Sequence, residues 1–125
     1  MERKIKIIAG EVIAEARLLA TSTADAIWEA LPLESTCNLW GDEIYFDIFL
    51  SHGLEKDARE LVDKGDLGYW PRGPAFCIFF GPTPMSTGDE IRPSSAVNVF
   101  GKVIGNSSVF KRVSSGTPIR VERAG

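Results

Sequence analysis

The sequence predicts a mainly β fold, an antiparallel sandwich or closed barrel of about eight short strands with one well-defined helix. Two observations predict it. Short β-rich runs recur between turn-forming residues, and residues 43–50 alternate with period two, which places Ile44, Phe46 and Ile48 on one face. A barrel is favoured because closing the sheet removes exposed strand edges.

An N-terminal hairpin followed by a helix is predicted from the first part of the chain. Residues 4–8 and 11–19 are β-rich runs separated by a glycine, which suits a tight turn between antiparallel strands. Ser22 and Asp25 fit a capping box, in which a hydroxyl cap precedes a carboxylate by three residues. Apolar residues then recur at helical spacing until Pro32, so we expect a helix of about ten residues.

The rest of the chain predicts further strands and two irregular segments. Residues 55–64 carry apolar residues at helical spacing over one turn only, which fits a short helix or an irregular strand. Residues 85–95 predict a polar loop, and Gly101 indicates a bulge or a sharp bend within a strand. The predicted strands are residues 33–39, 43–50, the two runs that flank a turn at 69–73, 96–104 and 117–123.

Composition and charge narrow the class of function. Residues 1–125 show no linker or repeat and are expected to form one domain with a core of its own. The formal net charge of −3 and the scattered cations argue against a nucleic-acid-binding surface. No apolar run is long enough for a membrane span, and the N-terminus lacks the apolar stretch of a signal peptide. We therefore expect a cytoplasmic protein.

Few side chains suit metal binding or nucleophilic catalysis. Cys37 and Cys77 lie in apolar runs, which fits buried free thiols and leaves a single bridge between them as the alternative. His52 is the only histidine, so no metal site is expected, and the glycines match no cofactor-binding loop. His52 with Ser51 and Glu55 is either a catalytic fragment or part of an ordinary polar loop.

The segment from Gly65 to Pro84 is the most informative part of the chain. Aromatic side chains and Cys77 are packed there between glycines and prolines, which predicts a strand, a tight turn and a second strand. Tyr69, Trp70 and Arg72 stand at the turn. The segment fits one wall of a binding groove on a rigid scaffold, or an ordinary piece of a closed barrel.

Five segments are distinctive: AIWEALP at 26–32, WGDEIYF at 40–46, GDLGYWP at 65–71, FFGPTP at 79–84 and VNVFGKV at 97–103. They resemble the cyclophilins, in which an FGKV segment follows the loop beside the active groove. A closer resemblance, over nearly the whole chain, is to the small bacterial and archaeal cyclophilin-like proteins. The resemblance implies a closed antiparallel β-barrel of about eight strands with one or two capping helices.

The catalytic residues of true cyclophilins are not found at matching positions. Their prolyl isomerisation uses an arginine that hydrogen-bonds the prolyl nitrogen and so weakens the amide resonance. Here no arginine occurs between Arg17 and Arg59. The expected glutamine is also missing near Ala75 and Phe76, and residues 92–97 contain neither tryptophan nor histidine. Arg72 is the one residue that could replace the lost arginine from the turn.

An aromatic groove is the candidate site. Aromatic rings pack well against proline and supply contact area at low entropic cost. The alternative is that most of these rings, Phe76 above all, belong to the core. The acidic residues near Tyr45 form either an acidic pocket or a solvated strand face. Trp70 is weighed among these rings, and the candidate site residues are Trp40, Glu43, Tyr45, Tyr69, Arg72, Phe76 and Phe79.

Three functions are compatible with these residues. The first is a binding module that holds a proline-containing peptide or a small molecule without catalysis and without a cofactor. The second is a weak or atypical peptidyl-prolyl isomerase, which rests on the resemblance alone. The third is an enzyme acting on a small molecule, with Glu43 and Tyr45 as acid or base. The oligomeric state is left open by the sequence.

Overall fold

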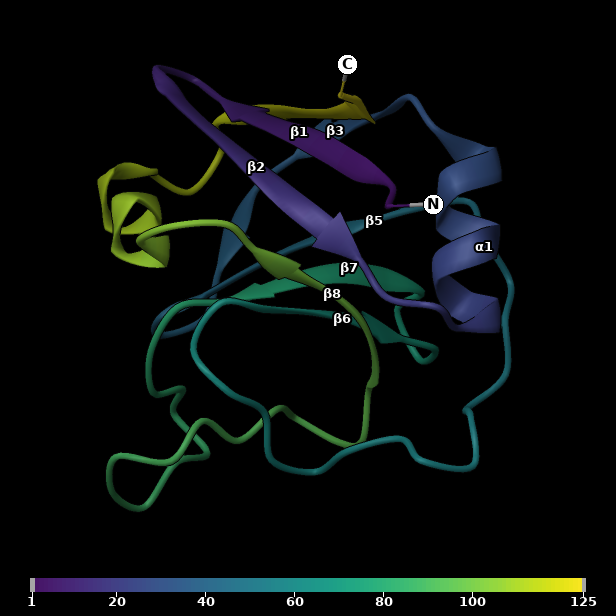
Figure 1. Ribbon diagram of the computed structural model, residues 1–125. Coiled ribbons are helices and arrows are strands. Elements are labelled where there is room, and N and C mark those ends of the chain that lie inside the picture. The colour runs from purple at the N-terminus through teal and green to yellow at the C-terminus, as the bar shows by residue number, and fades with distance from the viewer. Residues whose placement is uncertain (1, 125) are drawn as a thin grey trace.

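The computed structural model describes residues 2–124, which form a single antiparallel sheet with a helix against one side (Figure 1). The strands pair in the order β3-β9-β1-β2-β8-β6-β7-β5-β4. The strands are β1 (Lys4–Ala9), β2 (Val12–Leu18), β3 (Leu33–Thr36), β4 (Asn38–Leu39), β5 (Glu43–Asp47), β6 (Asp66–Trp70), β7 (Ala75–Phe79), β8 (Asn98–Val103) and β9 (Pro118–Arg123).

The sheet curls into a nearly closed barrel, because its two end strands are consecutive in the chain. β3 pairs with β9 and β4 pairs with β5, and only Cys37 separates β3 from β4. The Cys37 amide donates to the Thr117 carbonyl at 2.8 Å, and the Cys37 carbonyl accepts from the Gly116 amide at 2.9 Å. The predicted barrel is confirmed, with nine strands in residues 2–124 because the run at 33–39 is split in two.

The helix α1 (Ser22–Ala30) lies on one side of the barrel, and a short 3-10 helix, η1 (Ser107–Arg112), lies on the opposite side in Figure 1. The cap of α1 is Thr21, one residue before the predicted position, and its side-chain oxygen accepts from the Ala24 amide at 3.0 Å. The sequence analysis did not predict η1, since its six residues are too few to show helical periodicity.

The barrel interior is filled by apolar side chains from every long strand and from α1. Phe46 and Phe76 face each other across β5 and β7 with ring centroids 4.8 Å apart, and Phe100 meets Phe76 edge-on at 5.0 Å. Tyr69 is also inside, 1% exposed. Its hydroxyl donates to the Leu50 carbonyl at 2.6 Å, so the polar end of this side chain is satisfied within the core.

A second apolar layer covers the outer face of the strands β5, β7, β6 and β8. Two long segments, residues 48–65 and 80–97, run across this side at the bottom of Figure 1. Isolated bridges between Arg59 and Val97 and between Val62 and Ile91 join the two segments. Residues 55–64 therefore form no helix, and the alternative of an irregular extended segment with isolated pairing is the one observed.

The irregularity predicted at Gly101 is present where β8 meets β6. Leu67 pairs with Gly101, but the next residue of β6, Gly68, pairs with Val99, so the register shifts by one residue. A β-carbon on Gly101 would lie 2.9 Å from the Arg17 carbonyl of β2. The glycine thus permits the close approach of two strands beside the bulge.

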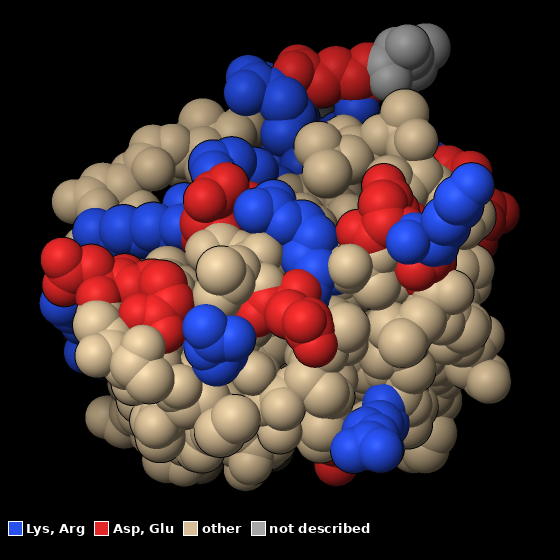
Figure 2. All heavy atoms as spheres, turned by 90° about the horizontal axis from the view of Figure 1, so that it is seen from below, with Lys and Arg blue, Asp and Glu red and all other residues tan. Residues whose placement is uncertain are grey.

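The side formed by the two long segments carries little charge over much of its area. In Figure 2, which views the molecule from below, cations and anions alternate in the upper half and the lower half is mostly uncharged. The two signs are interspersed, so this face presents no continuous basic surface. No helix within residues 2–124 is long and apolar enough to cross a membrane.

Candidate functional site

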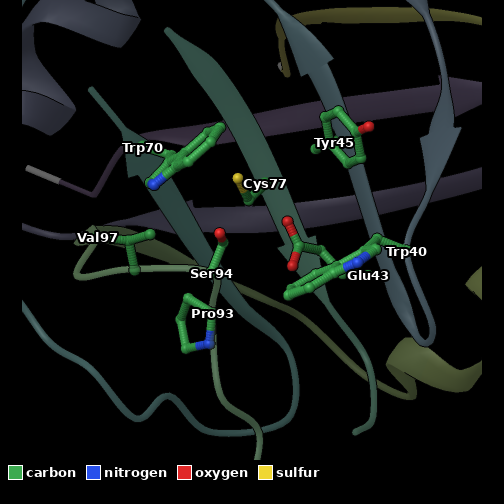
Figure 3. A pocket seen from close by; sticks show the side chains of 8 residues that line it. All are labelled: Trp40, Glu43, Tyr45, Trp70, Cys77, Pro93, Ser94 and Val97. Carbon is green, nitrogen blue, oxygen red and sulfur yellow. The ribbon is translucent and has the colours of Figure 1, made fainter. Parts of the chain in front are cut away.

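A pocket of about 220 Å³ opens on the outer face of the barrel, between the sheet and the segment 93–97 (Figure 3). Its walls come from the β4–β5 turn, from β5, β6 and β7, and from this covering segment. The lining residues are Trp40, Glu43, Tyr45, Trp70, Cys77, Pro93, Ser94 and Val97.

The side chains on the floor of the pocket come from the outward-facing positions of β5 and β7. Ile44 and Phe46 of β5 fill the barrel, so Glu43 and Tyr45 point to the opposite face. In the β5–β7 register Tyr45 stands opposite Cys77, which brings that thiol beside both β5 side chains. The predicted outward direction of Tyr45 is what the structure shows, and it faces the pocket.

One wall depends on a tight turn. The Trp40 amide donates to the Glu43 carbonyl at 2.9 Å, and the Glu43 amide donates back to the Trp40 carbonyl at 3.2 Å. Gly41 in this turn has φ +62°, and a β-carbon there would lie 2.8 Å from Cδ of Pro84. The Asp42 amide donates to the Pro82 carbonyl at 3.0 Å, so the turn that presents Trp40 is fixed to the chain beyond β7.

The facing wall is held by hydrogen bonds to the covering segment. Trp70 Nε1 donates to Ser95 Oγ at 2.6 Å, which ties the end of β6 to this segment. Farther back, the Glu90 carboxylate accepts from the Thr87 and Gly88 amides, each at 2.8 Å. These backbone bonds lower the pKa of Glu90 to about 2 and stabilise the loop that leads to Pro93.

Glu43 is the unusual group of the site. The residue is 6% exposed, and its Oε1 atom is buried without a hydrogen-bond partner. Burial raises its pKa from 4.5 to about 7, and the interaction with the Cys77 thiol lowers it by less. Figure 3 shows the carboxyl group pointing toward the centre of the pocket. A buried carboxyl without a partner is costly, which makes this position a candidate for ligand contact.

The Cys77 thiol has the opposite chemistry to a reactive nucleophile. Burial, and next the Glu43 carboxylate beside it, raise its pKa well above the ordinary value. Burial likewise raises the pKa of Cys37 to about 11. Both cysteines are free, in agreement with the first of the two alternatives given by the sequence. Each thiol therefore stays protonated at neutral pH.

The structure brings together only part of the predicted groove. Trp40, Glu43 and Tyr45 line the pocket. Tyr69 and Phe76 do not, because they point into the barrel, at 1% and 0% exposed.

Phe79 and Arg72 lie elsewhere as well. Phe79 is fully buried in the outer apolar layer, where it packs among Val62, Ile91 and Val97. Arg72 is exposed and borders a separate depression with Leu54 and Glu60, so it does not replace the cyclophilin arginine at this pocket.

Trp70, which the sequence analysis weighed among the groove aromatics, also lines the pocket, and four lining residues were not among the groove candidates: Cys77, Pro93, Ser94 and Val97. The period-two pattern could have found Cys77 as the partner of an outward Tyr45 once the β5–β7 pairing was known. Pro93, Ser94 and Val97 come from a segment whose position depends on long-range bridges, for which the sequence carries no local signal.

A polar cluster around His52 stabilises the fold. The serine near His52 is Ser22, at 3.2 Å from Nε2, and not the predicted Ser51. Glu55 accepts from the Thr23 amide at 2.9 Å, from the Thr23 hydroxyl and from the Ser22 hydroxyl at 3.2 Å. Burial raises the pKa of Glu55, but the hydrogen bonds from Thr23 and Ser22 together lower it by more. The net pKa is therefore below its ordinary value.

These contacts make Glu55 a cap for the first turn of α1. The carboxylate contacts the serine directly and does not orient the imidazole from its far side, as a catalytic triad requires. Within residues 2–124 no group of three or more His, Cys, Asp or Glu side chains is placed to hold a metal ion.

Comparison with known proteins agrees with this fold. The cyclophilin-like family profile matches residues 3–122. The chain belongs to the cyclophilin-like family. No curated protein matches it in sequence. The solution structure of the hypothetical protein AF2241 from Archaeoglobus fulgidus is 41% identical, with a TM-score of 0.84, over 98% of this chain and 95% of that one.

A more distant structure shows the same fold in a larger protein. The structure of McbB in complex with tryptophan has a TM-score of 0.72 at 16% identity. The match covers 97% of this chain and 45% of McbB, so the cyclophilin-like barrel accounts for less than half of that protein. At this identity the similarity concerns the fold alone.

Proposed function

We propose that this domain binds a small organic molecule in the pocket on the outer face of the barrel. The observation that carries the proposal is that three aromatic side chains, Trp40, Tyr45 and Trp70, line the pocket together with one buried polar group, Glu43. Binding sites for small molecules have this composition, with mostly apolar linings and few well-placed polar groups. The volume of about 220 Å³ lies below the range of roughly 300–1,000 Å³ that drug-sized ligands occupy, so the ligand is small or is a single side chain of a peptide.

Ligand-detected and protein-detected NMR test this function. A library of small neutral and charged fragments, with short proline-containing peptides included, is added to the labelled protein. We expect the indole signals of Trp40 and Trp70 to shift together, since both rings line the pocket. Ser94→Trp, at an exposed lining position, should fill the pocket and abolish these shifts.

Ser115→Trp is the matched control for that substitution. Ser115 is also exposed and lies outside the pocket, so this variant should bind fragments as the wild type does. Absence of any fragment that shifts both indoles would remove the proposed function. Shifts that survive Ser94→Trp would place binding elsewhere.

A second candidate function is acid–base catalysis on the bound molecule. Its support is that Glu43 borders the pocket with a pKa of about 7, so that both protonation states are populated near neutral pH. Deuterium from the solvent should then enter a carbon position of a bound fragment faster than in buffer. Incorporation at the buffer rate would leave binding alone.

The isomerase alternative has no such support. None of the eight residues that line the pocket is cationic, whereas the cyclophilin reaction depends on an arginine at the prolyl nitrogen. We expect the cis-to-trans rate of a short X–Pro peptide to be unchanged at high protein concentration. An accelerated rate that Arg72→Ala abolishes would reinstate the isomerase.

A further inference from the structure

Resting on the proposed binding function, the geometry points to a small organic cation as the ligand, with its ammonium group at Glu43 and its apolar body between the aromatic walls. The pocket would thus select for positive charge, and not merely for an apolar molecule of suitable size.

The first support is the state of the Glu43 carboxyl group. Its Oε1 is buried without a hydrogen-bond partner, and the side chain points into the pocket (Figure 3). Neutral ligand carbonyls cannot pair with a carboxylate, whereas an ammonium group supplies N–H donors and the compensating charge. A ligand cation would therefore remove the one unsatisfied buried side-chain atom found in residues 2–124.

The second support is a contrast within the same fold. Asp66 is buried to a similar degree, at 4% exposed, but Arg59 and Lys102 lie 3.7 and 3.4 Å from its oxygens. It also accepts from the Asp63 amide at 2.8 Å. The protein thus supplies its own cations to one buried carboxylate and none to Glu43, which leaves that place for a cation from outside.

The nearby charged side chains do not fill this role. Lys111 of η1 pairs with Asp42 at 3.9 Å, and Arg92, just before the covering segment, pairs with Glu90 at 3.5 Å. The other titratable groups that line the pocket are Tyr45 and Cys77, which carry no positive charge in either state.

The third support is the chemistry of the walls. Trp40 lies beside the Glu43 carboxyl, and Trp70 lies across the pocket from it, with Tyr45 on the same strand as Glu43 (Figure 3). The faces of such rings attract a cation within about 6 Å of the ring centroid, and the attraction grows when water is excluded. Pro93 and Val97 add uncharged surface for the apolar part of the ligand.

The decisive experiment compares charged and neutral probes of equal shape. Benzylammonium is titrated against benzyl alcohol, and cyclohexylammonium against cyclohexanol, by calorimetry and NMR. At pH 8 we expect each ammonium ion to bind at least tenfold more tightly than its neutral counterpart. Because only ionised Glu43 pairs with a cation, the affinity should fall about a hundredfold between pH 8 and pH 5.

Two variants assign the effect to Glu43. Glu43→Gln should abolish the preference for the ammonium ions. The variant's NMR spectrum should stay dispersed, which shows that it is folded. Asp47→Asn removes the same charge from an exposed position on the same face of β5, outside the pocket, and should keep the preference.

The outcomes separate this inference from the proposed function. Equal binding of charged and neutral probes, or binding that strengthens as the pH falls, overturns the cation inference and leaves the pocket as a site for neutral molecules. Failure of both ammonium ions to bind overturns it as well, whatever neutral fragments do. Only the absence of every fragment from the pocket removes the proposed function too.

Discussion

The two faces of the β5–β7 strand pair have different surroundings. Inside the barrel, Phe46 and Phe76 stack in a closed apolar core. One residue along each strand, on the outer face, Tyr45 and Cys77 border an open pocket in which Glu43 has a buried oxygen without a partner. The inner face stabilises the fold, whereas the outer face retains a buried carboxyl that lowers stability. Such a group is expected where a residue serves binding and not folding.

The largest expected effect concerns the inner face. Phe76→Ala should lower the free energy of unfolding by about 3–5 kcal/mol, because it leaves a cavity between Phe46 and Phe100. Cys77→Ala, at the next residue but on the outer face, should cost about 1 kcal/mol. Urea denaturation of both variants measures the difference. Equal losses would mean that the two faces are packed alike.

The next effect is the pH dependence of stability that Glu43 causes on the outer face. The unfolded carboxyl of Glu43 ionises near its ordinary pKa of 4.5, whereas the folded one stays protonated up to about 7. Between these values the folded state binds more protons, so its stability falls as the pH rises through this window, by about 3 kcal/mol in total. Urea denaturation at intervals from pH 4.5 to 8 should show this trend in the wild type relative to Glu43→Gln. A constant difference between the two proteins would show that Glu43 ionises normally.

The smallest effect compares the two buried carboxylates. Asp66→Asn should destabilise the protein by about 1–2 kcal/mol at pH 8, because the interactions with Arg59 and Lys102 depend on its charge. Glu43→Gln at the same pH should not destabilise it, since no partner loses an interaction at Oε1. Thermal unfolding of the two variants gives the signs directly. Loss of stability in both would indicate that Glu43 has a structural role.

The barrel and the direction of the β5 side chains could be predicted because short stretches of the sequence show the strand pattern. Alternation along residues 43–50 placed Ile44 and Phe46 inside and Tyr45 outside, and the structure agrees. The split at Cys37 and the 3-10 helix at Ser107–Arg112 depend on contacts with distant residues and left no pattern in the sequence.

The candidate site was predicted only in part, because β6 and β7 are covered on both faces. Their apolar runs are almost continuous, so period-two alternation cannot show which side chains face outward. Tyr69 and Trp70 are adjacent and point to opposite faces, and the register shift at Gly68 makes the direction of each harder to predict. Tyr69 and Trp70 were therefore both weighed for the groove, although only Trp70 lines it.

The covering segments 48–65 and 80–97 meet each other at two isolated bridges and supply no rung of the long strand pairings. The length or sequence of these segments can therefore change without disturbing the strand pairings of the barrel. A descendant of this chain could acquire a different ligand by remodelling residues 93–97 alone, and an engineer could graft new loops at the same place to redirect its selectivity.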